Sequence, residues 1–276
     1  MPSPVKDDIS DIKAMYDAGL EREKNRLVRH QLEHELTWRY LDKYLPAQGN
    51  ILEIGAATGR YTLELARRGY TVTALDLSKT LTAYSRIQVA QAGLMERVRH
   101  MVGDARDLGM SGDEIYDAAL IMGPLYHLIF ESDRRSALRQ VFCLLKPGGV
   151  IFTTFISRLG IWGDVMNRQP GLVEKDAEVR SVMALGYNAS DRIPGGFRGY
   201  FATVEEVAPL HESLGFETVS VAGVEPAIGA DDAIYNSLEG SIRRLWLDLL
   251  FEISDKPSIV GASRHLLYIG RKPGSI

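Results

Sequence analysis

Residues 50–65, NILEIGAATGRYTLEL, constrain the fold of this chain more than any other stretch. They predict a buried strand over residues 51–54, a turn bounded by Gly55 and Gly59, and a helix that begins near Arg60. A strand that ends in small residues and leads directly into a helix presents backbone N–H groups to a polar or anionic ligand. We therefore expect a ligand site that is built from backbone and requires small side chains.

The rest of the chain alternates between strand and helix patterns. Further strands are predicted at residues 71–77, 97–102, 116–122, 150–155, 216–223 and 265–270, and helices at 60–68, 79–92, 133–145 and 204–214. This alternation predicts an α/β fold, a doubly wound, Rossmann-like sheet of seven mostly parallel strands with helices on both faces. Right-handed crossovers then bring the strand-to-helix turns to one edge, where open sheets of this kind bind ligands.

Helical segments elaborate a single domain that we expect to span residues 1–276. Residues 1–46 are predicted to form an N-terminal helical cover, and residues 229–262 a helical insertion before the last strand, with one helix over 230–251. Residues 156–202 interrupt the alternation after a strand at the ligand edge, so we interpret them as an inserted lid. A purely structural excursion is the alternative.

Composition limits the partners and the location. The formal net charge is −4 and the basic residues are scattered, so nucleic acid is not an expected partner. The single cysteine, Cys143, excludes an intrachain disulfide and a cysteine-based metal site. Without a signal-peptide pattern or a bilayer-spanning apolar run, we expect no membrane partner and a cytoplasmic location. The oligomeric state, monomer or homodimer, stays open.

The glycine pattern of the first turn distinguishes between cofactors. A dinucleotide site requires G-x-G-x-x-G, and residues 55–59 lack both that spacing and the third glycine, which disfavours NAD. The pattern Glu53-x-Gly55-x-Ala57-x-Gly59 resembles the first motif of class I S-adenosylmethionine-dependent methyltransferases, which is acid-x-G-x-G-x-G. The resemblance implies S-adenosylmethionine as cofactor, S-adenosylhomocysteine as product and no metal, with Ala56 also at the site. The chain departs from the motif at Ala57, whose methyl group narrows the approach of the cofactor.

Later acids lie where this family would have them. The resemblance implies further cofactor contacts at Asp76, Leu77, Asp104, Ala105 and Met122. Asp76 ends the second strand, where a carboxylate can accept both ribose hydroxyls, and Asp104 follows the third strand, where it would meet the adenine amino group. The resemblance covers residues 50–155, including an LKPGG corner, and residues 216–271. Helix capping is the alternative for Asp76 and for Ser78.

The GPLYHL turn at residues 123–128 would lie beside the methyl group that such an enzyme transfers. Transfer from an already activated donor mainly requires alignment of the nucleophile and removal of its proton. His127, with an ordinary pKa of about 6.5, is the candidate base, and Tyr126 would orient the acceptor or line the path of the methyl group. Alternatively, the pair only buttresses the turn.

The chain also resembles a bacterial, small-molecule-type subgroup of these enzymes. The similarity rests on an N-terminal helix with Tyr16 and Arg26-Leu27, on GPLYHL, on GYF at residues 199–201 and on the closing SRHLLYIGRKP. It implies that Tyr16 and Arg26 fold over the cofactor, with Arg26 binding its carboxylate. An ordinary solvated helix face is the alternative for Arg26.

His30, Glu33 and His34 spell H-x-x-E-H, the inverted zinc-peptidase motif, and both histidines are expected on one helical face. A zinc peptidase needs a further ligand on a fitting fold, whereas this segment leads into a methyltransferase-like sheet. We therefore expect no metal and interpret both histidines as helix-face residues. The other histidines without a paired ligand are expected to be structural: His100, His211 and His265.

We expect the acceptor pocket between the N-terminal cover, the GPLYHL turn and the lid. Beside Tyr126 and His127, its expected lining is Trp162, Met166, Met183, Tyr187, Phe197, Tyr200 and Phe201. Core packing is the alternative for side chains of this kind. The hypothesis is an enzyme that transfers a methyl group to O, N or S of a small organic molecule. The alternatives are a methyltransferase acting on RNA or a peptide, a non-catalytic S-adenosylmethionine-binding sensor and, more distantly, a nicotinamide-dependent oxidoreductase.

Overall fold

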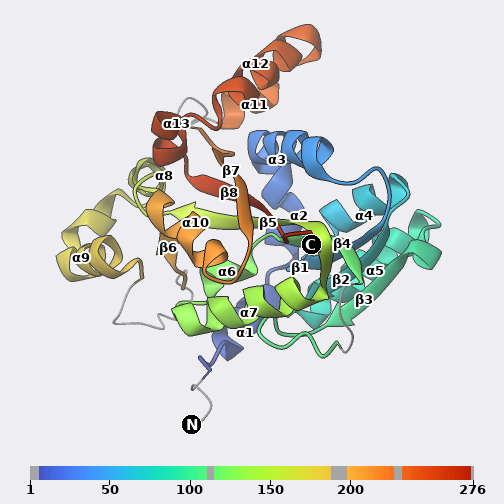
Figure 1. Cartoon of the computed structure of the whole chain (residues 1–276). Helices are drawn as coiled ribbons and strands as arrows, with labels where there is room; N and C mark the ends of the chain where they lie inside the picture. The colour runs from blue at the N-terminus through green and yellow to red at the C-terminus, as the bar shows by residue number, and fades with distance from the viewer. Residues whose placement is uncertain (1–5, 111–114, 188–197, 227–231, 275–276) are drawn as a thin grey trace.

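The computed structural model describes residues 6–110, 115–187, 198–226 and 232–274. Its strands are β1 (Asn50–Ile54), β2 (Thr71–Asp76), β3 (Val98–Val102), β4 (Tyr116–Ile121), β5 (Leu145–Ser157), β6 (Phe201–Ala202), β7 (Glu217–Gly223) and β8 (His265–Arg271). They form one sheet in the order β3-β2-β1-β4-β5-β8-β7, and the short β6 pairs with β5 (Figure 1).

The strands from β3 to β5 run parallel to their neighbours, whereas β8 is antiparallel to both β5 and β7. The expected α/β fold with a doubly wound, mostly parallel sheet is confirmed, and β6 adds two residues to the seven expected strands. From β1 the chain first adds β2 and β3 on one side and then continues with β4 on the other. Sheets of this kind bind ligands at such a switch point, outside the carboxyl ends of the strands.

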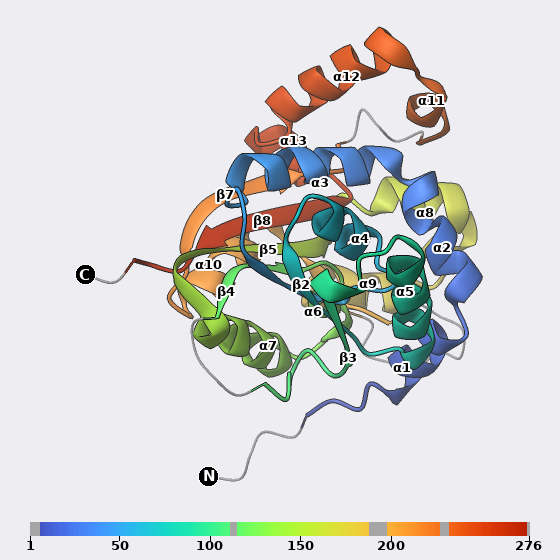
Figure 2. The same ribbon diagram turned by 90° about the vertical axis from the view of Figure 1, so that its right-hand side faces the viewer.

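Helices cover both faces of the sheet. The first part of the described chain contains α1 (Ser10–Asp17), α2 (Leu20–Arg29), α3 (Gln31–Tyr44), α4 (Arg60–Arg67), α5 (Lys79–Gln91), η1 (Met95–Arg97), α6 (Pro124–His127) and α7 (Glu131–Leu144). The second part contains α8 (Trp162–Arg168), η2 (Pro170–Glu174), α9 (Asp176–Leu185), α10 (Val204–Glu212), α11 (Asp232–Ser237), α12 (Gly240–Ile253) and α13 (Pro257–Ala262). One face is covered by α3, α4 and α5, and the other by α7 and α10 (Figures 1 and 2).

The strand β1 shows why the sheet needs helices on both faces. Ile51 belongs to the core beneath α3 and α4, whereas Leu52 and Ile54 belong to the core beneath α7 and α10. All three side chains are fully buried. A continuous apolar run is the pattern of a strand that is covered on both faces.

The single helix expected over residues 230–251 is wrong. The described part of this segment forms α11 and α12, and Gly240 begins α12 with a left-handed φ of 57°. Arg243 Nη1 donates to the carbonyls of Tyr235 (3.2 Å) and Leu238 (3.1 Å). The guanidinium therefore satisfies carbonyl groups that lose their helical partners at the break. The α11–α12 pair lies outside α3, away from the sheet (Figure 2).

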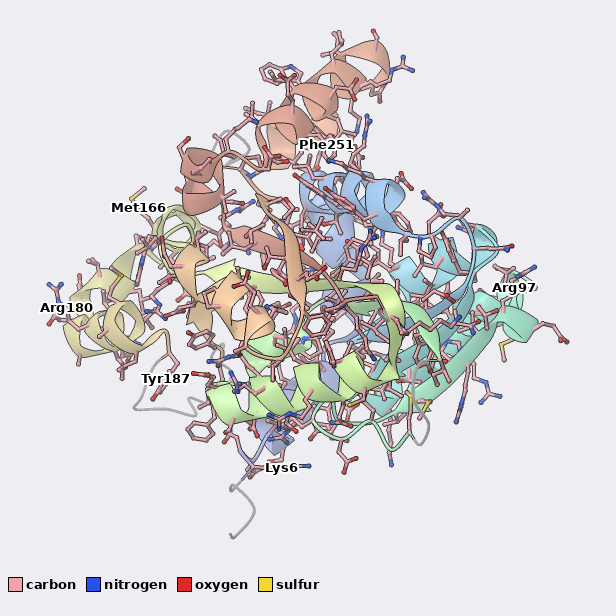
Figure 3. All side chains as sticks on the ribbon, in the orientation of Figure 1. Lys6, Arg97, Met166, Arg180, Tyr187 and Phe251 are labelled. Atoms are coloured by element: carbon pink, nitrogen blue, oxygen red, sulfur yellow. The ribbon has the colours of Figure 1, made fainter. Side chains whose placement is uncertain are left out.

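The segment between β5 and β6 contributes α8, η2 and α9. In Figure 1 α9 lies at the periphery, and Figure 3 shows Met166 of α8 and Arg180 of α9 at the outer surface. Among the described residues, no helix combines the length and the apolar character of a bilayer-spanning segment.

Candidate cofactor and acceptor site

A cavity of about 650 Å³ lies at the carboxyl ends of β1 to β4. Its other walls come from α1 and α2, from α6 and α8, and from the residues that follow β7 and begin β8. The expected cofactor residues that line it are Tyr16, Arg26, Gly55, Ala57, Asp76, Leu77, Asp104, Ala105 and Met122. Glu53 and Ala56 instead line an adjoining cavity of about 50 Å³.

The turn between β1 and α4 requires glycine for packing as well as for conformation. Gly55 and Gly59 both have a φ of 79°. A Cβ at Gly55 would lie 2.5 Å from Pro124 Cδ, and a Cβ at Gly59 would lie 2.0 Å from Ser85 Oγ. Gly59 thus allows the turn to pack closely against α5. It does not line either cavity. Ala57 is the single non-glycine residue with positive φ (48°) in the described part of the chain.

Asp76 connects this turn to the end of β2. Its Oδ2 accepts the backbone N–H of Ala57 (2.7 Å) and its Oδ1 accepts that of Ser78 (2.8 Å). Each carboxylate oxygen retains a lone pair for a ligand hydroxyl. Burial raises the pKa of Asp76, although the two backbone hydrogen bonds oppose this effect. The cap of α5 is Ser78, whose Oγ accepts the N–H of Leu81 (3.2 Å), so Asp76 is not the cap.

Asp104 is fixed by Arg106, which the sequence reasoning missed. The guanidinium donates from Nη2 to Asp104 Oδ2 (2.7 Å) and from Nε to Asp104 Oδ1 (3.1 Å). Burial raises the pKa of Asp104, but the hydrogen bonds and charge of Arg106 outweigh this effect and lower it. Arg106 Nη1 also donates to the carbonyl of Asp7 (2.6 Å) and to Asp133 Oδ2 (2.9 Å). The carboxylate at the end of β3 is therefore linked to the N-terminal segment.

The half-buried Tyr16 and the buried His127 form a polar pair beside Tyr126. Tyr16 Oη lies 2.6 Å from His127 Nε2, and His127 Nδ1 lies 3.1 Å from the carbonyl oxygen of Arg198. Burial lowers the pKa of His127 to about 4 and raises that of Tyr16, so both groups are neutral at neutral pH. A carbonyl only accepts, which assigns the imidazole proton to Nδ1. Nε2 therefore accepts the hydroxyl proton of Tyr16.

The H-x-x-E-H expectation of two histidines on one helical face is wrong, because α2 ends before His30 and α3 begins after it. His30 lines the large cavity with its Nδ1 3.3 Å from Glu225 Oε1. His34 Nε2 instead accepts from the indole N–H of Trp38 (3.0 Å). The break therefore turns the two imidazoles to different neighbours.

Glu33, Glu225 and His265 bring possible metal ligands within 4.8 Å of one another. Arg26 contacts Glu33 (2.9 Å) and Arg264 contacts Glu225 (2.7 Å). The two guanidinium groups already balance the carboxylate charges, so the cluster is better described as an ion-pair network than as a cation site. Because Arg26 belongs to this network, Glu33 also fixes its guanidinium at the cavity wall.

Glu225, Arg264 and His265 line the cavity although the sequence reasoning did not select them, and His265 was expected to be structural only. Since β8 is antiparallel to β5 and β7, residues just after β7 and just before β8 lie at the carboxyl edge of the parallel strands. An antiparallel last strand was therefore the signal from which these site residues could have been found. From α8, Asp164 and Arg168 join this part of the lining.

Of the expected acceptor residues, Tyr126 and His127 line the cavity, whereas the described aromatic residues expected from the lid do not. Tyr200 is buried elsewhere, donating to Glu206 Oε2 (2.6 Å) with Arg134 3.6 Å from its ring centroid. Phe201 belongs to β6, and Trp162 begins α8 while its neighbour Ile161 lines the cavity. The other apolar residues expected there also lie outside the lining: Met166, which is 66% exposed (Figure 3), Met183, which is 40% exposed, and Tyr187, which packs against the core. Phe197 lies outside the described residues.

Ala57→Gly is expected to stabilise the protein by up to about 1 kcal/mol. A left-handed φ costs a non-glycine residue roughly 1–2 kcal/mol, and the extra chain entropy of glycine offsets part of this gain. Urea unfolding measures the change. Ala56→Gly, at a buried position without positive φ, is the control and should destabilise. Equal loss of stability in both variants would contradict the strain at Ala57.

Glu53→Gln is expected to change how stability depends on pH. Burial raises the pKa of Glu53 to about 8, although Thr62 donates a hydrogen bond to its carboxyl group. The folded state then binds more protons than the unfolded state between about pH 4.5 and 8, so the wild type loses stability as the pH rises through this range. The variant should lack this loss, a difference of up to about 1.4 kcal/mol per pH unit. Parallel pH profiles in urea unfolding would refute the shifted pKa, and Glu64→Gln on the surface of α4 is the control.

Residues 51–149 match the model of a family described as a methyltransferase domain. Among curated relatives, a ubiquinone biosynthesis O-methyltransferase of Xanthomonas axonopodis is 31% identical over 113 residues, which is 41% of this chain and 45% of the relative. A tRNA 5-carboxymethoxyuridine methyltransferase of Escherichia coli is 26% identical over 49% of this chain and 52% of its own length. The chain therefore spans about half the length of the curated relatives that it matches.

Solved structures resemble the whole chain. A Burkholderia thailandensis 1,6-didemethyltoxoflavin-N1-methyltransferase, solved with bound 1,6-didemethyltoxoflavin and S-adenosylhomocysteine, gives a TM-score of 0.58 at 18% identity, covering 99% of this chain and 93% of its own. The [4+2]-cyclase SpnF gives a TM-score of 0.61 at 17% identity, covering 99% and 100%. At these identities the likeness establishes the fold. Residues 51–149 thus match a methyltransferase domain, and the chain as a whole has the fold of S-adenosylmethionine-dependent methyltransferases.

Proposed function

We propose that the protein is an S-adenosylmethionine-dependent methyltransferase that transfers a methyl group to O, N or S of a small organic molecule and releases S-adenosylhomocysteine. The observation that carries this proposal is one cavity lined both by Asp76 and Asp104 at the strand ends and by the hydrogen-bonded pair of Tyr16 and His127. The match of residues 51–149 to a methyltransferase domain supports it.

The residues at the strand ends fit a nucleoside. Asp76 has a lone pair on each oxygen for the ribose hydroxyls, and Asp104 is ionised and held in place by Arg106 to accept from the adenine amino group. Leu77 and Ala105 supply apolar surface between them. In this proposal Gly55, Ala57 and Met122 contact the cofactor, Arg26 faces its carboxylate, and Glu53, Ala56 and Gly59 support the turn. When bound, S-adenosylmethionine supplies a methyl group activated by its positively charged sulfur.

The cavity walls favour a small acceptor. The helices α1, α2 and α8 line the cavity opposite the strand ends, which suits an enclosed molecule better than a nucleic acid strand. The net charge of −4 also disfavours a nucleic acid strand, because its phosphate backbone is negative. The similarity to a tRNA-modifying relative makes RNA the second candidate acceptor.

We propose that residues 1–46 form a cover over the site and residues 156–202 a lid. We also propose the expected bacterial origin and cytoplasmic location.

In the proposed mechanism Tyr16 and His127 remove the acceptor proton together. Because His127 Nε2 accepts from Tyr16, the imidazole reaches the acceptor through the phenol oxygen. Tyr16 Oη takes the proton of the acceptor while its own proton passes to Nε2, and the carbonyl of Arg198 holds the Nδ1 proton in place. S-adenosylmethionine held by Asp76 and Asp104 would supply the methyl group and would keep the electrons of its carbon–sulfur bond. Tyr126, whose ring centroid lies 4.8 Å from that of His127, lines the path of the methyl group.

Incubation with methyl-labelled S-adenosylmethionine separates the functional candidates. Labelling of a compound in a bacterial metabolite extract is the expected result. Label that enters total tRNA alone would instead support an RNA methyltransferase. Binding of the cofactor without labelling in either preparation would favour a sensor.

Asp76→Ala is expected to weaken S-adenosylmethionine binding by about 2–3 kcal/mol, because it removes two charge-assisted hydrogen bonds to the ribose. Isothermal titration calorimetry measures this loss. Asp107→Ala changes an exposed acid outside the cavity lining, so it is the matched control and should bind as the wild type does. Unchanged affinity in Asp76→Ala would refute the ribose role.

Tyr16→Phe is expected to slow methyl transfer by about 10²-fold or more, since it breaks the proton path to His127. Cofactor affinity should stay within about twofold, because the ring that lines the cavity remains. His127→Gln should show a similar loss. Tyr126→Phe, which removes a neighbouring buried phenol, is the control and should retain most of the rate. A fully active Tyr16→Phe enzyme would reduce the pair to packing.

A further inference from the structure

One side of α12 is apolar and exposed. Ile242, Leu245, Trp246 and Leu249 are 58%, 68%, 43% and 45% exposed. Their spacing of i, i+3, i+4 and i+7 places them on one helical face. We call these four residues the outer stripe. Large apolar side chains that gather on a protruding element mark interaction sites more often than isolated ones do.

The opposite side of α12 already packs against the protein. Leu250 is buried, and the ring centroid of Phe251 lies 4.9 Å from that of Tyr40 in α3. Arg243 contacts Glu35 of α3 at 2.6 Å. Figures 1 and 2 show α12 at the outside of the molecule with α3 between it and the sheet, and Figure 3 labels Phe251 on the side near α3. The outer stripe is therefore a second apolar surface, separate from the one that the fold uses.

The last turn of α12 carries a charge that opposes the dipole of the helix. Its first turn contains no acidic residue and its N-cap, Glu239, makes no side-chain capping bond, while its last turn contains no basic residue. Glu252 lies in that last turn, next to the outer stripe at i+3 from Leu249. A negative charge is unfavourable at the C-terminal end of a helix and favourable at an N-terminal end. An antiparallel neighbour would bring an N-terminal end beside Glu252.

We propose that the outer stripe is the interface of a homodimer in which α12 packs antiparallel against α12 of a second copy. In this arrangement Leu245 faces Leu249 of the second copy across a twofold axis that crosses the outer stripe at the height of residue 247, so the stripe is complementary to itself. Glu252 of each copy then lies at the first turn of the other α12, where backbone N–H groups attract it. The dipoles of the two helices oppose one another.

Sedimentation of the full chain at micromolar concentrations tests this proposal. The wild type is expected to be a dimer and Leu245→Glu a monomer. Ile87→Glu, at a 54% exposed apolar residue of α5, is the matched control and should remain a dimer. A monomeric wild type, or a dimer that survives Leu245→Glu, would overturn the proposal. A monomer that binds vesicles or another protein through the outer stripe would overturn the proposal as well.

A charge variant tests the antiparallel orientation without removing apolar surface. Glu252→Lys should weaken the dimer by about tenfold, since it places a cation at each partner helix N-terminus. In the monomeric Leu245→Glu background the same change should leave the thermal unfolding midpoint unchanged or raised, because a cation suits the C-terminal end of its own helix. Adding Ser241→Glu to Glu252→Lys should restore the dimer. If Glu252→Lys leaves the dimer as stable as the wild type, or if the double variant does not regain the dimer, the antiparallel pairing would be contradicted.

Discussion

The carboxylate of Asp76 is the interaction on which the site depends. By accepting backbone N–H groups from Ala57 and Ser78, it ties the turn after β1 to the turn after β2. The turn after β1 borders the point between β1 and β4 where the strand order reverses, and both turns line the cavity, so one side chain fixes its floor. The same contact holds Ala57 in a left-handed conformation, which is unfavourable for a non-glycine residue. Strain at this position is thus coupled to the orientation of the carboxylate.

The wall opposite the strands is fastened by side chains that meet across long sequence distances. Arg106 joins Asp104 to the backbone of Asp7, and Asp7 forms an ion pair with Arg198. The carbonyl of Arg198 in turn holds the imidazole of His127. The Asp104 carboxylate, the N-terminal segment and the proposed base therefore belong to one hydrogen-bonded network. Ordering of the N-terminal segment and assembly of the proposed catalytic pair are expected to occur together.

Sequence reasoning predicted the parts that local pattern determines. Alternating apolar runs identified the sheet, and the two acids were located because Asp76 ends β2 and Asp104 comes shortly after β3. Arg106, Glu225 and His265 could not be selected from local pattern, since their partners lie on distant segments. In the lid the error is the opposite one, a residue selected for the site that does not line it. Tyr200 was selected because it is aromatic, but it packs with Glu206 and Arg134 in a separate polar cluster. The break at His30 was missed because the flanking residues all favour helix.

Calorimetric titration with S-adenosylmethionine and, in parallel, with NAD tests the central claim most directly. The geometry of Asp76, Asp104 and the glycine-bounded turn predicts that S-adenosylmethionine binds and that NAD does not. Tight binding of NAD without binding of S-adenosylmethionine would contradict the account.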